Sequence, residues 1–190
     1  MPTASETKVV TGPVRLSYVH LFEAWANDDS QEPRFSATLL IPKSDKQTLA
    51  RIEKARQAAI TAKWGAKPPK ALKNTLHDGD DEDKFDHEKN PECAGHMVMA
   101  CASKTRPGVV DRQLQPTIDS TEVYSGCFAR VSINAFAYEH PQGGKGTSFG
   151  LNHVMKWEDG DFLGGRSRAE DDFADIAEAP DGQGDVEDLL

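Results

Sequence analysis

The sequence predicts a mainly β domain with one helix, folded as a small mixed-β barrel and followed by an acidic C-terminal tail. Short runs of β-branched and aromatic residues recur along the chain and are separated by clusters of turn-forming residues. A long helical pattern occurs once, between the early and the late runs. The last 22 residues, 169–190, contain nine acidic side chains and no basic one. These observations predict one folded domain over residues 1–165 and a tail over residues 166–190.

Charge separates the tail from the domain. Residues 1–168 contain 22 Lys and Arg residues and 22 Asp and Glu residues, so the formal net charge of −9 resides in residues 169–190. A run of like charges repels itself and cannot bury its carboxylates, which predicts a disordered interaction tail. The residues before it are enough for one domain with a sizeable core.

The composition disfavours a membrane or secreted protein. The mean hydropathy is −0.60, and no apolar run approaches the roughly 18 residues that a membrane span needs. The N-terminus lacks the pattern of a signal peptide. Three widely spaced cysteines fit reduced thiols in a cytoplasm of bacterial type. We therefore expect a cytoplasmic protein with no membrane partner.

No catalytic or metal-binding motif accompanies the six histidines. The chain contains no nucleophile elbow, zinc-protease motif or Cys-x-x-Cys motif. Cys93, His96 and Cys101 match no standard zinc spacing. The acidic run that begins at Asp78 has its glycine in the wrong place for an EF-hand loop. The sequence therefore indicates neither an enzyme nor a bound metal or cofactor.

The early part of the domain predicts two strands. Residues 8–25 are rich in β-branched and aromatic side chains and predict one strand, bent or interrupted at Gly12 and Pro13. A polar turn follows over residues 27–33. Residues 34–42 predict a second strand, whose continuously apolar end indicates burial on both faces.

The long helical pattern covers residues 44–64. Ser44 and Gln47 predict a capping box at its start, and Gly65 stands where a helix is expected to stop. Its apolar side chains fall close to one stripe: Leu49, Ile52, Ala55, Ala59 and Ile60. We expect this helix to pack on the domain and plug its core.

Two charged segments follow the helix. Residues 67–74 are basic and broken by prolines, whereas residues 78–92 contain eight acidic residues and two lysines. We interpret residues 78–92 as an acidic loop insertion. Outside this loop and the tail, 20 basic and 14 acidic residues remain, so the rest of the domain is mildly cationic.

The late part of the domain is β-rich. Turn-forming residues at 106–108, 125–126 and 141–146 separate the predicted strands. These strands cover residues 95–103, 108–114, 127–138 and 148–157.

The strand at 127–138 is the most informative about function. Its odd positions are small and apolar, which suits a core. Its even positions mix aromatic rings, polar groups and a cation. Such a face suits nucleic acid, because bases stack on rings while cations neutralise phosphates. The alternative is that these rings pack under a loop or against the helix.

Five stretches, taken in order along the chain, resemble one known family. They are RFSATLLIPKSD (34–45), PGVVDR (107–112), YSGCFARVSINAFAY (124–138), KGTSFGLNHVMK (145–156) and LGGRSRAEDDFAD (163–175). The chain resembles the tailed-bacteriophage single-stranded DNA-binding proteins, once known only as a domain of unknown function. The resemblance implies an OB-type barrel that binds and protects single-stranded DNA during phage replication and recombination, in the infected bacterial cell.

An OB barrel would present one sheet face and its flanking loops to the nucleic acid. On that basis we predict a groove that contains Arg130, Phe136 and Tyr138, with Tyr124 as a further stacking residue. Phosphate contacts from the loops are predicted for Lys104, Arg106, Arg112 and Lys145. On the first strand, Arg15 and Tyr18 are additional candidates. The three tryptophans, Trp25, Trp64 and Trp157, could stack on bases but are more typical of a core.

The acidic tail acquires a role in this interpretation. Its carboxylates can compete with DNA for a cationic groove. When DNA occupies the groove, the tail is free to dock on replication or recombination proteins. The candidate tail residues are Asp171, Asp172, Phe173, Asp175, Ile176, Leu189 and Leu190. The alternative is that the tail only keeps the protein soluble.

A second hypothesis is an acidic protein-interaction module, such as a DNA mimic that binds no DNA itself. The net charge favours this hypothesis, whereas the cationic remainder and the aromatic strand face oppose it. A nuclease would need carboxylates clustered on strands, which the pattern does not contain. The sequence leaves open whether the protein forms a homo-oligomer and whether it also binds RNA.

Overall fold

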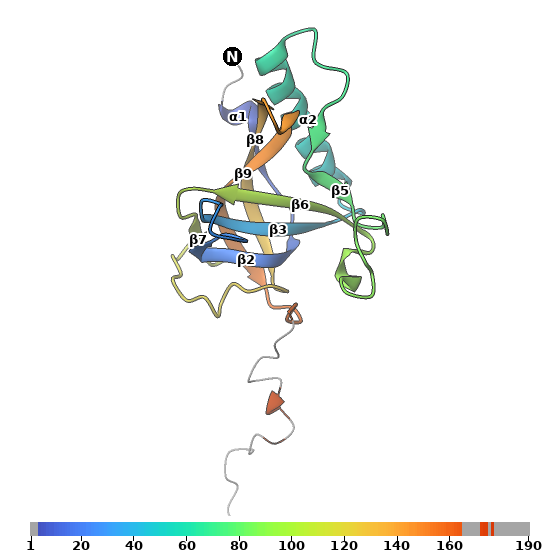
Figure 1. The fold of residues 1–190 in the computed structure, drawn as a ribbon. Helices are drawn as coiled ribbons and strands as arrows, with labels where there is room; N and C mark the ends of the chain where they lie inside the picture. Colours follow the sequence, from blue (N-terminus) through green and yellow to red (C-terminus); the bar gives the residue numbers. More distant parts are fainter. Residues whose placement is uncertain (1–3, 165–171, 175, 177–190) are drawn as a thin grey trace, which may run out of the picture.

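Five strands of eight or more residues close into a barrel in the computed structural model (Figure 1). The structure describes residues 4–164, 172–174 and 176. The five strands are β2 (Val14–Trp25), β3 (Arg34–Pro42), β6 (His96–Ser103), β8 (Phe128–His140) and β9 (Gly144–Glu158). Their order around the barrel is β2-β3-β6-β9-β8, and β8 pairs again with β2. This mainly β barrel with one long helix confirms the predicted fold class; most of the predicted tail lies outside the described residues.

Short elements complete the sheet. They are α1 (Ala4–Thr7), β1 (Lys8–Val10), β4 (Lys73–Asn74), β5 (Leu76–Asp78), η1 (Pro91–Cys93) and β7 (Gly108–Val110). Strand β1 is antiparallel to β8, and β5 is antiparallel to β6. Strands β4 and β7 run parallel to different parts of β9.

The predicted interruption of the first strand is confirmed at Gly12 and Pro13. Buried Thr11 joins the two halves to β8, because its hydroxyl accepts a hydrogen bond from the Val131 amide at 3.0 Å. The Gly12 amide donates to the Thr48 hydroxyl at 2.9 Å. A Cβ atom at Gly12 would lie 2.5 Å from a carboxylate oxygen of Asp45, so a larger residue there would have to displace the carboxylate that caps the helix.

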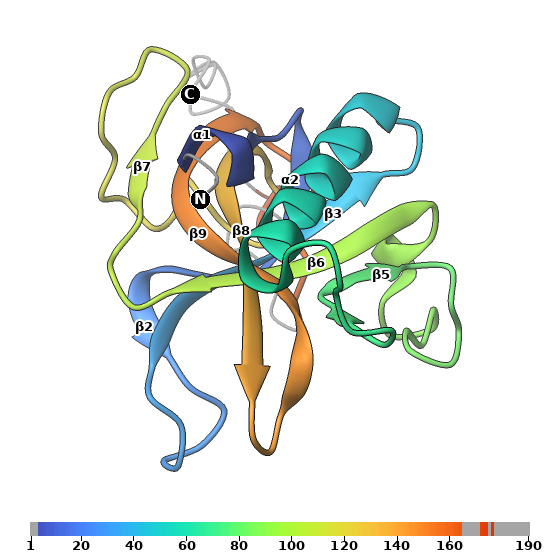
Figure 2. The ribbon, with the colours of Figure 1, turned by 90° about the horizontal axis from the view of Figure 1, so that it is seen from above.

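The single long helix, α2 (Lys46–Trp64), packs against β8 and β1 (Figure 2). Its inward stripe is as predicted, with Ile52, Ala55, Ala59 and Ile60 buried. The predicted capping box is wrong by one residue: Asp45 is the N-cap, and its carboxylate accepts a hydrogen bond from the Thr48 amide at 3.1 Å. The helix ends before Gly65, which has a φ of 62° as expected of a glycine stop.

The late strands differ from the prediction mainly at their ends. Strand β7 stops at Val110, because the Asp111 carboxylate accepts hydrogen bonds from the amides of Gln113 and Gln115 and turns the chain. The β8–β9 hairpin is longer than predicted, and its strands leave only residues 141–143 as the connection. Residues 144–146, predicted as a loop, are therefore paired strand.

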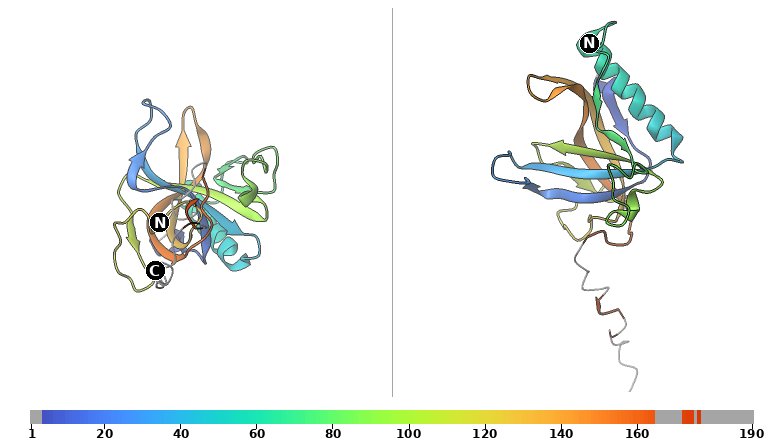
Figure 3. Two further views of the ribbon diagram at one scale, coloured as in Figure 1. Left: turned by 90° about the horizontal axis from the view of Figure 1, so that it is seen from below. Right: turned by 45° about the vertical axis from the view of Figure 1, so that its right-hand side comes forward.

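Two hairpins project to the same side of the barrel. In Figure 2 the β2–β3 hairpin and the β8–β9 hairpin both point away from α2, and Figure 3 shows the same arrangement from two other directions. In Figure 1, β2, β3 and β6 lie in front of β8 and β9. Their outer face is therefore on the side to which the hairpins point. No helix in the described part of the chain is long and apolar enough to span a membrane.

Candidate nucleic-acid interface

The outer face of β3 and β6 carries only small side chains over two successive cross-strand pairs. The residues that alternate with them, such as Leu39 and Met99, belong to the core and are fully buried. The outward residues form the pairs Ser36–Ala102 and Thr38–Ala100, and we call these four residues the shelf. Because small side chains leave the strand backbone accessible, a nucleotide chain can lie close to the sheet here. In OB barrels the face of the second and third strands, which β3 and β6 are here, is the oligonucleotide-binding face.

Tyr18 stands at the edge of the shelf. Its side chain is 64% exposed, and its φ of 47° lies in the left-handed region that a tyrosine rarely adopts. The pairing of β2 with β3 shifts between Ser17 and His20, so Tyr18 lies in a bulge. Bulges re-aim side chains next to functional sites. Tyr18, Thr38 and Ala100 line one cleft of about 360 Å³.

His20 and Trp25 extend this aromatic edge along β2. Their rings stack in parallel, with centroids 4.7 Å apart and planes inclined by 6°. Partial burial lowers the pKa of His20 from its ordinary value, which favours the neutral ring. Trp25 is 49% exposed, and His20 pairs with Ser36 of the shelf. The predicted core position of Trp25 is therefore wrong, and its stacking alternative is the one that the geometry permits.

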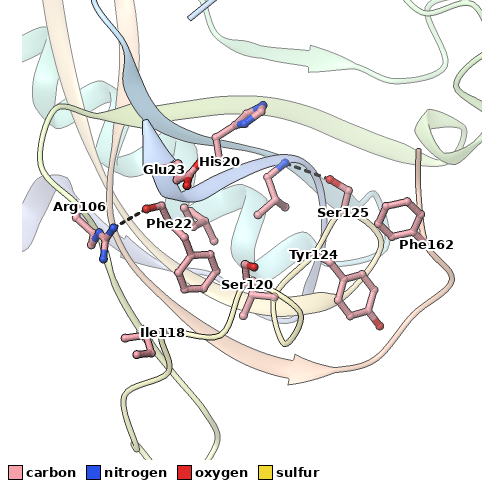
Figure 4. A pocket seen from close by; sticks show the side chains of 12 residues that line it. His20, Phe22, Glu23, Arg106, Ile118, Ser120, Tyr124, Ser125 and Phe162 are labelled. Atoms are coloured by element: carbon pink, nitrogen blue, oxygen red, sulfur yellow. Dashed lines mark hydrogen bonds between the residues drawn. The ribbon is translucent and has the colours of Figure 1, made fainter. Parts of the chain in front are cut away.

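The two faces of β2 differ in what they present. Figure 4 shows the Phe22 ring directed into a cleft and the His20 ring on the other side of the strand. This cleft has a volume of about 670 Å³ and is lined by β2, by Ile118 and by Phe162 among others. Arg106 lies at its margin, where its guanidinium donates a hydrogen bond to the carbonyl oxygen of Phe22.

Two of the predicted phosphate-binding cations lie beside the β2–β3 hairpin. The Arg106 guanidinium is 6.0 Å from the centroid of the Phe35 ring. The Lys104 ammonium forms an exposed ion pair with Glu32, at 3.3 Å. Exposed Arg34 pairs in register with Trp25. The structure thus gathers three cations near the stacked rings, and Arg34 is a residue that the sequence analysis did not single out.

The β8–β9 hairpin carries the predicted rings Phe136 and Tyr138. Phe136 is 44% exposed and lines a shallow cleft with Lys63. Tyr138 lies across β9, since a Cβ atom at Gly146 would be 2.8 Å from its hydroxyl. The Lys145 ammonium forms an ion pair with Glu139 at 3.1 Å, which partly neutralises it.

Arg15 and Tyr124 have structural partners instead. The Arg15 guanidinium donates to the carbonyl oxygens of Gly126 and Asp161, at 3.1 and 2.8 Å. Tyr124 is 8% exposed, and its hydroxyl bonds the Asp159 carboxylate at 3.0 Å. The buried Tyr124 ring is not accessible to a stacking base. Arg15 and Tyr124 therefore stabilise the fold and are not part of the shelf.

Arg112 and Arg130, the remaining predicted cations, lie elsewhere on the barrel. Both guanidinium groups contact the Trp157 ring on β9. They do not line the cleft that contains Tyr18, Thr38 and Ala100.

The acidic loop closes one end of the outer face. Phe85 and Cys93 pack on Leu40 and Val98, which continue the outward rows beyond the shelf. The Lys43 ammonium bridges the carboxylates of Asp78 and Asp80, at 2.6 and 2.5 Å. Hydrogen bonds from Lys43 lower the pKa of both carboxyl groups. Among the described residues no group of three or more His, Cys, Asp or Glu side chains is arranged to hold a metal ion.

Solved structures of phage proteins share this architecture. The single-stranded DNA-binding protein from bacteriophage Enc34 in complex with ssDNA superposes with a TM-score of 0.72 at 27% identity, covering 83% of this chain and 90% of that protein. Gp2.5, a single-stranded DNA-binding protein of bacteriophage T7, has the same fold with a TM-score of 0.57 at 18% identity, covering 93% of this chain and 98% of gp2.5.

Sequence comparison assigns the family. Protein p50 of Acyrthosiphon pisum secondary endosymbiont phage 1 is 30% identical over 183 residues, which cover 90% of this chain and 95% of p50. The family model of the Enterobacter phage Enc34 ssDNA-binding protein matches residues 7–184. The chain therefore belongs to the family of the Enterobacter phage Enc34 ssDNA-binding protein.

Proposed function

We propose that this protein binds single-stranded DNA without sequence preference, along the shelf and between the two projecting hairpins. The observation that carries the proposal is the row of aromatic rings, exposed Tyr18 and the stack of His20 on exposed Trp25, beside a strand face of small residues. Bases stack on such rings whatever their identity, at about 1–3 kcal/mol per base. Family membership and the Enc34 complex with ssDNA support the same function.

In this mechanism rings and cations have separate tasks. Tyr18 and Trp25 supply stacking surfaces, while Arg34, Lys104 and Arg106 neutralise phosphates beside them. On the second hairpin, Phe136 and Tyr138 extend the contact. Because exposed ion pairs such as Lys104–Glu32 contribute little, a phosphate can replace the carboxylate at small cost.

The biological role follows from binding alone. The protein would coat and protect single-stranded DNA during phage replication and recombination, in the cytoplasm of the infected bacterial cell. It would do so without catalysing a reaction, as expected of a protein that holds a strand by stacking and charge.

The acidic tail adds regulation to this proposal. Its carboxylates would compete with DNA for the cationic groove and, once displaced, recruit replication or recombination proteins. Of the predicted tail residues, Asp172, Phe173 and Ile176 are described; Phe173 and Ile176 are 57% and 71% exposed, which suits apolar anchors for a partner. Asp171, Asp175, Leu189 and Leu190 lie outside the described residues.

A titration with fluorescent oligo-dT tests the function, with a duplex of equal length as competitor and at two salt concentrations. We expect preferential binding to the single strand that weakens as salt rises, because phosphate contacts release counterions. Absence of binding by both the full chain and a chain lacking residues 169–190 would contradict the proposal and favour the DNA-mimic hypothesis.

A further inference from the structure

Two guanidinium groups converge on one indole outside the shelf. The Arg112 Cζ atom lies 3.9 Å from the centroid of the Trp157 ring, and the Arg130 Cζ atom lies 5.6 Å from it. Arg112 follows β7, Arg130 lies on β8 and Trp157 lies on β9. We call these three residues the Arg–Trp–Arg cluster.

The cluster lies on a different side of the barrel from the shelf. Strand β9 is paired with β7 at Val110–Met155 and with β8 at Arg130–Met155, so the three strands form one continuous sheet there. Figure 2 shows β7 and the connection after it on the side away from the tips of the two hairpins. A strand of DNA on the shelf must therefore pass round the barrel to reach the cluster.

The charges of the cluster are fixed in place but not neutralised. The Arg130 Nε atom donates to the carbonyl oxygen of Thr11 at 3.0 Å, which orients its head group. The cation–π contact with the Trp157 ring orients exposed Arg112. Neither arginine forms an ion pair with a described residue, and neighbouring Asp111 uses its carboxylate on two backbone amides. Two such cations on one ring repel each other until an anion binds between or beside them.

The chemistry of the cluster favours a phosphate group as its ligand. A guanidinium stacked on an aromatic ring still presents its N–H edge, whose fork matches two phosphate oxygens. None of the clefts described above is lined by a residue of the cluster, so an apolar anchor such as Phe173 has no recess there. A phosphodiester needs no recess.

We propose that the Arg–Trp–Arg cluster is a second phosphate-binding site for single-stranded DNA, which holds the strand after it leaves the shelf. The proposal rests on the proposed function and extends it: the shelf binds bases and phosphates, whereas the cluster binds phosphates alone. Short strands occupy only the shelf, and longer strands reach both sites.

The test compares full-length wild-type protein with R112A/R130A on oligo-dT of about 8 and about 30 nucleotides; the first length lies within the usual site of one OB barrel, about 4–16 nucleotides, and the second exceeds it. For the long strand we expect the slope of log K against log salt to become shallower by about 1.4, since single strands release about 0.7 counterion per phosphate contact. Its affinity at low salt should fall by about tenfold or more. Affinity for the short strand should stay at the wild-type value.

A charge-matched control is R51A/K54A, which removes two exposed cations from α2. An equal loss of affinity and slope in this control would overturn the proposal, because the effect would then follow net charge. Unchanged binding of the long strand by R112A/R130A would overturn it as well. Tighter binding of DNA by R112A/R130A would indicate that the cluster binds the carboxylates of the tail, and it would also overturn the proposal.

Folding is checked by circular dichroism. If the double variant does not fold, the single variant R112A is measured, because Arg112 is exposed. For the long strand, the slope of log K against log salt should then become shallower by about 0.7. Absence of binding to both strands by wild-type protein would refute the proposed function itself, which separates that failure from failure of the second site.

Discussion

At the scale of single residues, Tyr18 shows what the local sequence can and cannot predict. Its ring and its place on the first strand made it a candidate, but its exposure depends on a bulge. The bulge is held by a hydrogen bond from the Val19 amide to the Ser125 hydroxyl, at 3.1 Å, across more than 100 residues of sequence. A backbone held in a sparsely populated conformation is typical of functional sites.

Replacing Tyr18 with alanine should weaken binding of oligo-dT by about tenfold, because one stacked base loses its ring. Fluorescence titration measures this loss, and Tyr18→Phe, which keeps the ring, should bind nearly as wild type. Since the side chain is mostly exposed, thermal unfolding of Tyr18→Ala should stay close to wild type. A Phe variant as weak as the Ala variant would contradict a stacking role.

Joint replacement of Phe136 and Tyr138 with alanine should also reduce the affinity for oligo-dT. The expected loss is at least the stacking contribution of about one base. Both lie on the face of β8 opposite the buried odd positions, so the domain should still fold. Circular dichroism and the same titration distinguish the outcomes. Unfolding of this variant would show that the two rings stabilise the hairpin rather than bind DNA.

Other candidate residues show why residue types alone mislead. Arg15 and Tyr124 have suitable chemistry, yet both are engaged by residues 159–161, far away in sequence. Trp25 was expected in the core, because a tryptophan in a small domain usually is. Its exposure follows from its position at the end of β2, where the strand has left the barrel and joins a projecting hairpin.

At the scale of elements, periodicity predicts what one strand or helix does by itself. The alternation of β8 was correct, with Ala129, Val131 and Ile133 fully buried. The inward stripe of α2 was correct for the same reason. Strand ends were less predictable: the glycine-rich residues 144–146 are paired with β8 because the hairpin continues beyond the barrel.

The helix start gives a direct stability prediction. Asp45→Ala should destabilise the protein by about 1 kcal/mol, because the Thr48 amide loses its cap. Ser44→Ala should change the free energy of unfolding much less, since Ser44 does not cap the helix. Urea denaturation of both variants measures the difference, and the reverse order would restore the capping box predicted from the sequence.

At the scale of the whole molecule, the pattern of strands and turns predicted a small mixed-β barrel but not which strands pair to close it. The pairings β3–β6 and β8–β9 join neighbouring or nearby strands, but β6 meets β9 only at Ala102 and Gly150. The resemblance to phage proteins added that this barrel is of the OB type. The surface that we propose for DNA binding follows from the side chains that the closed barrel exposes.

If the tail competes with DNA as proposed, deleting residues 169–190 should tighten binding of oligo-dT at low salt, because nine carboxylates are removed. The gain should shrink as salt rises and screens the competition. Titrations of both forms at two salt concentrations test this. Equal or weaker affinity of the shortened chain at low salt would contradict competition by the tail.

The bridge from Lys43 to Asp78 and Asp80 fixes the acidic loop at one end of the outer face, while Arg34, Lys104 and Arg106 lie toward the other. The path along the shelf therefore has a repulsive end and an attractive end. Copies loaded one after another on the same strand would all point the same way, head to tail. A coated strand would then have a direction that another protein could read without contacting a single base.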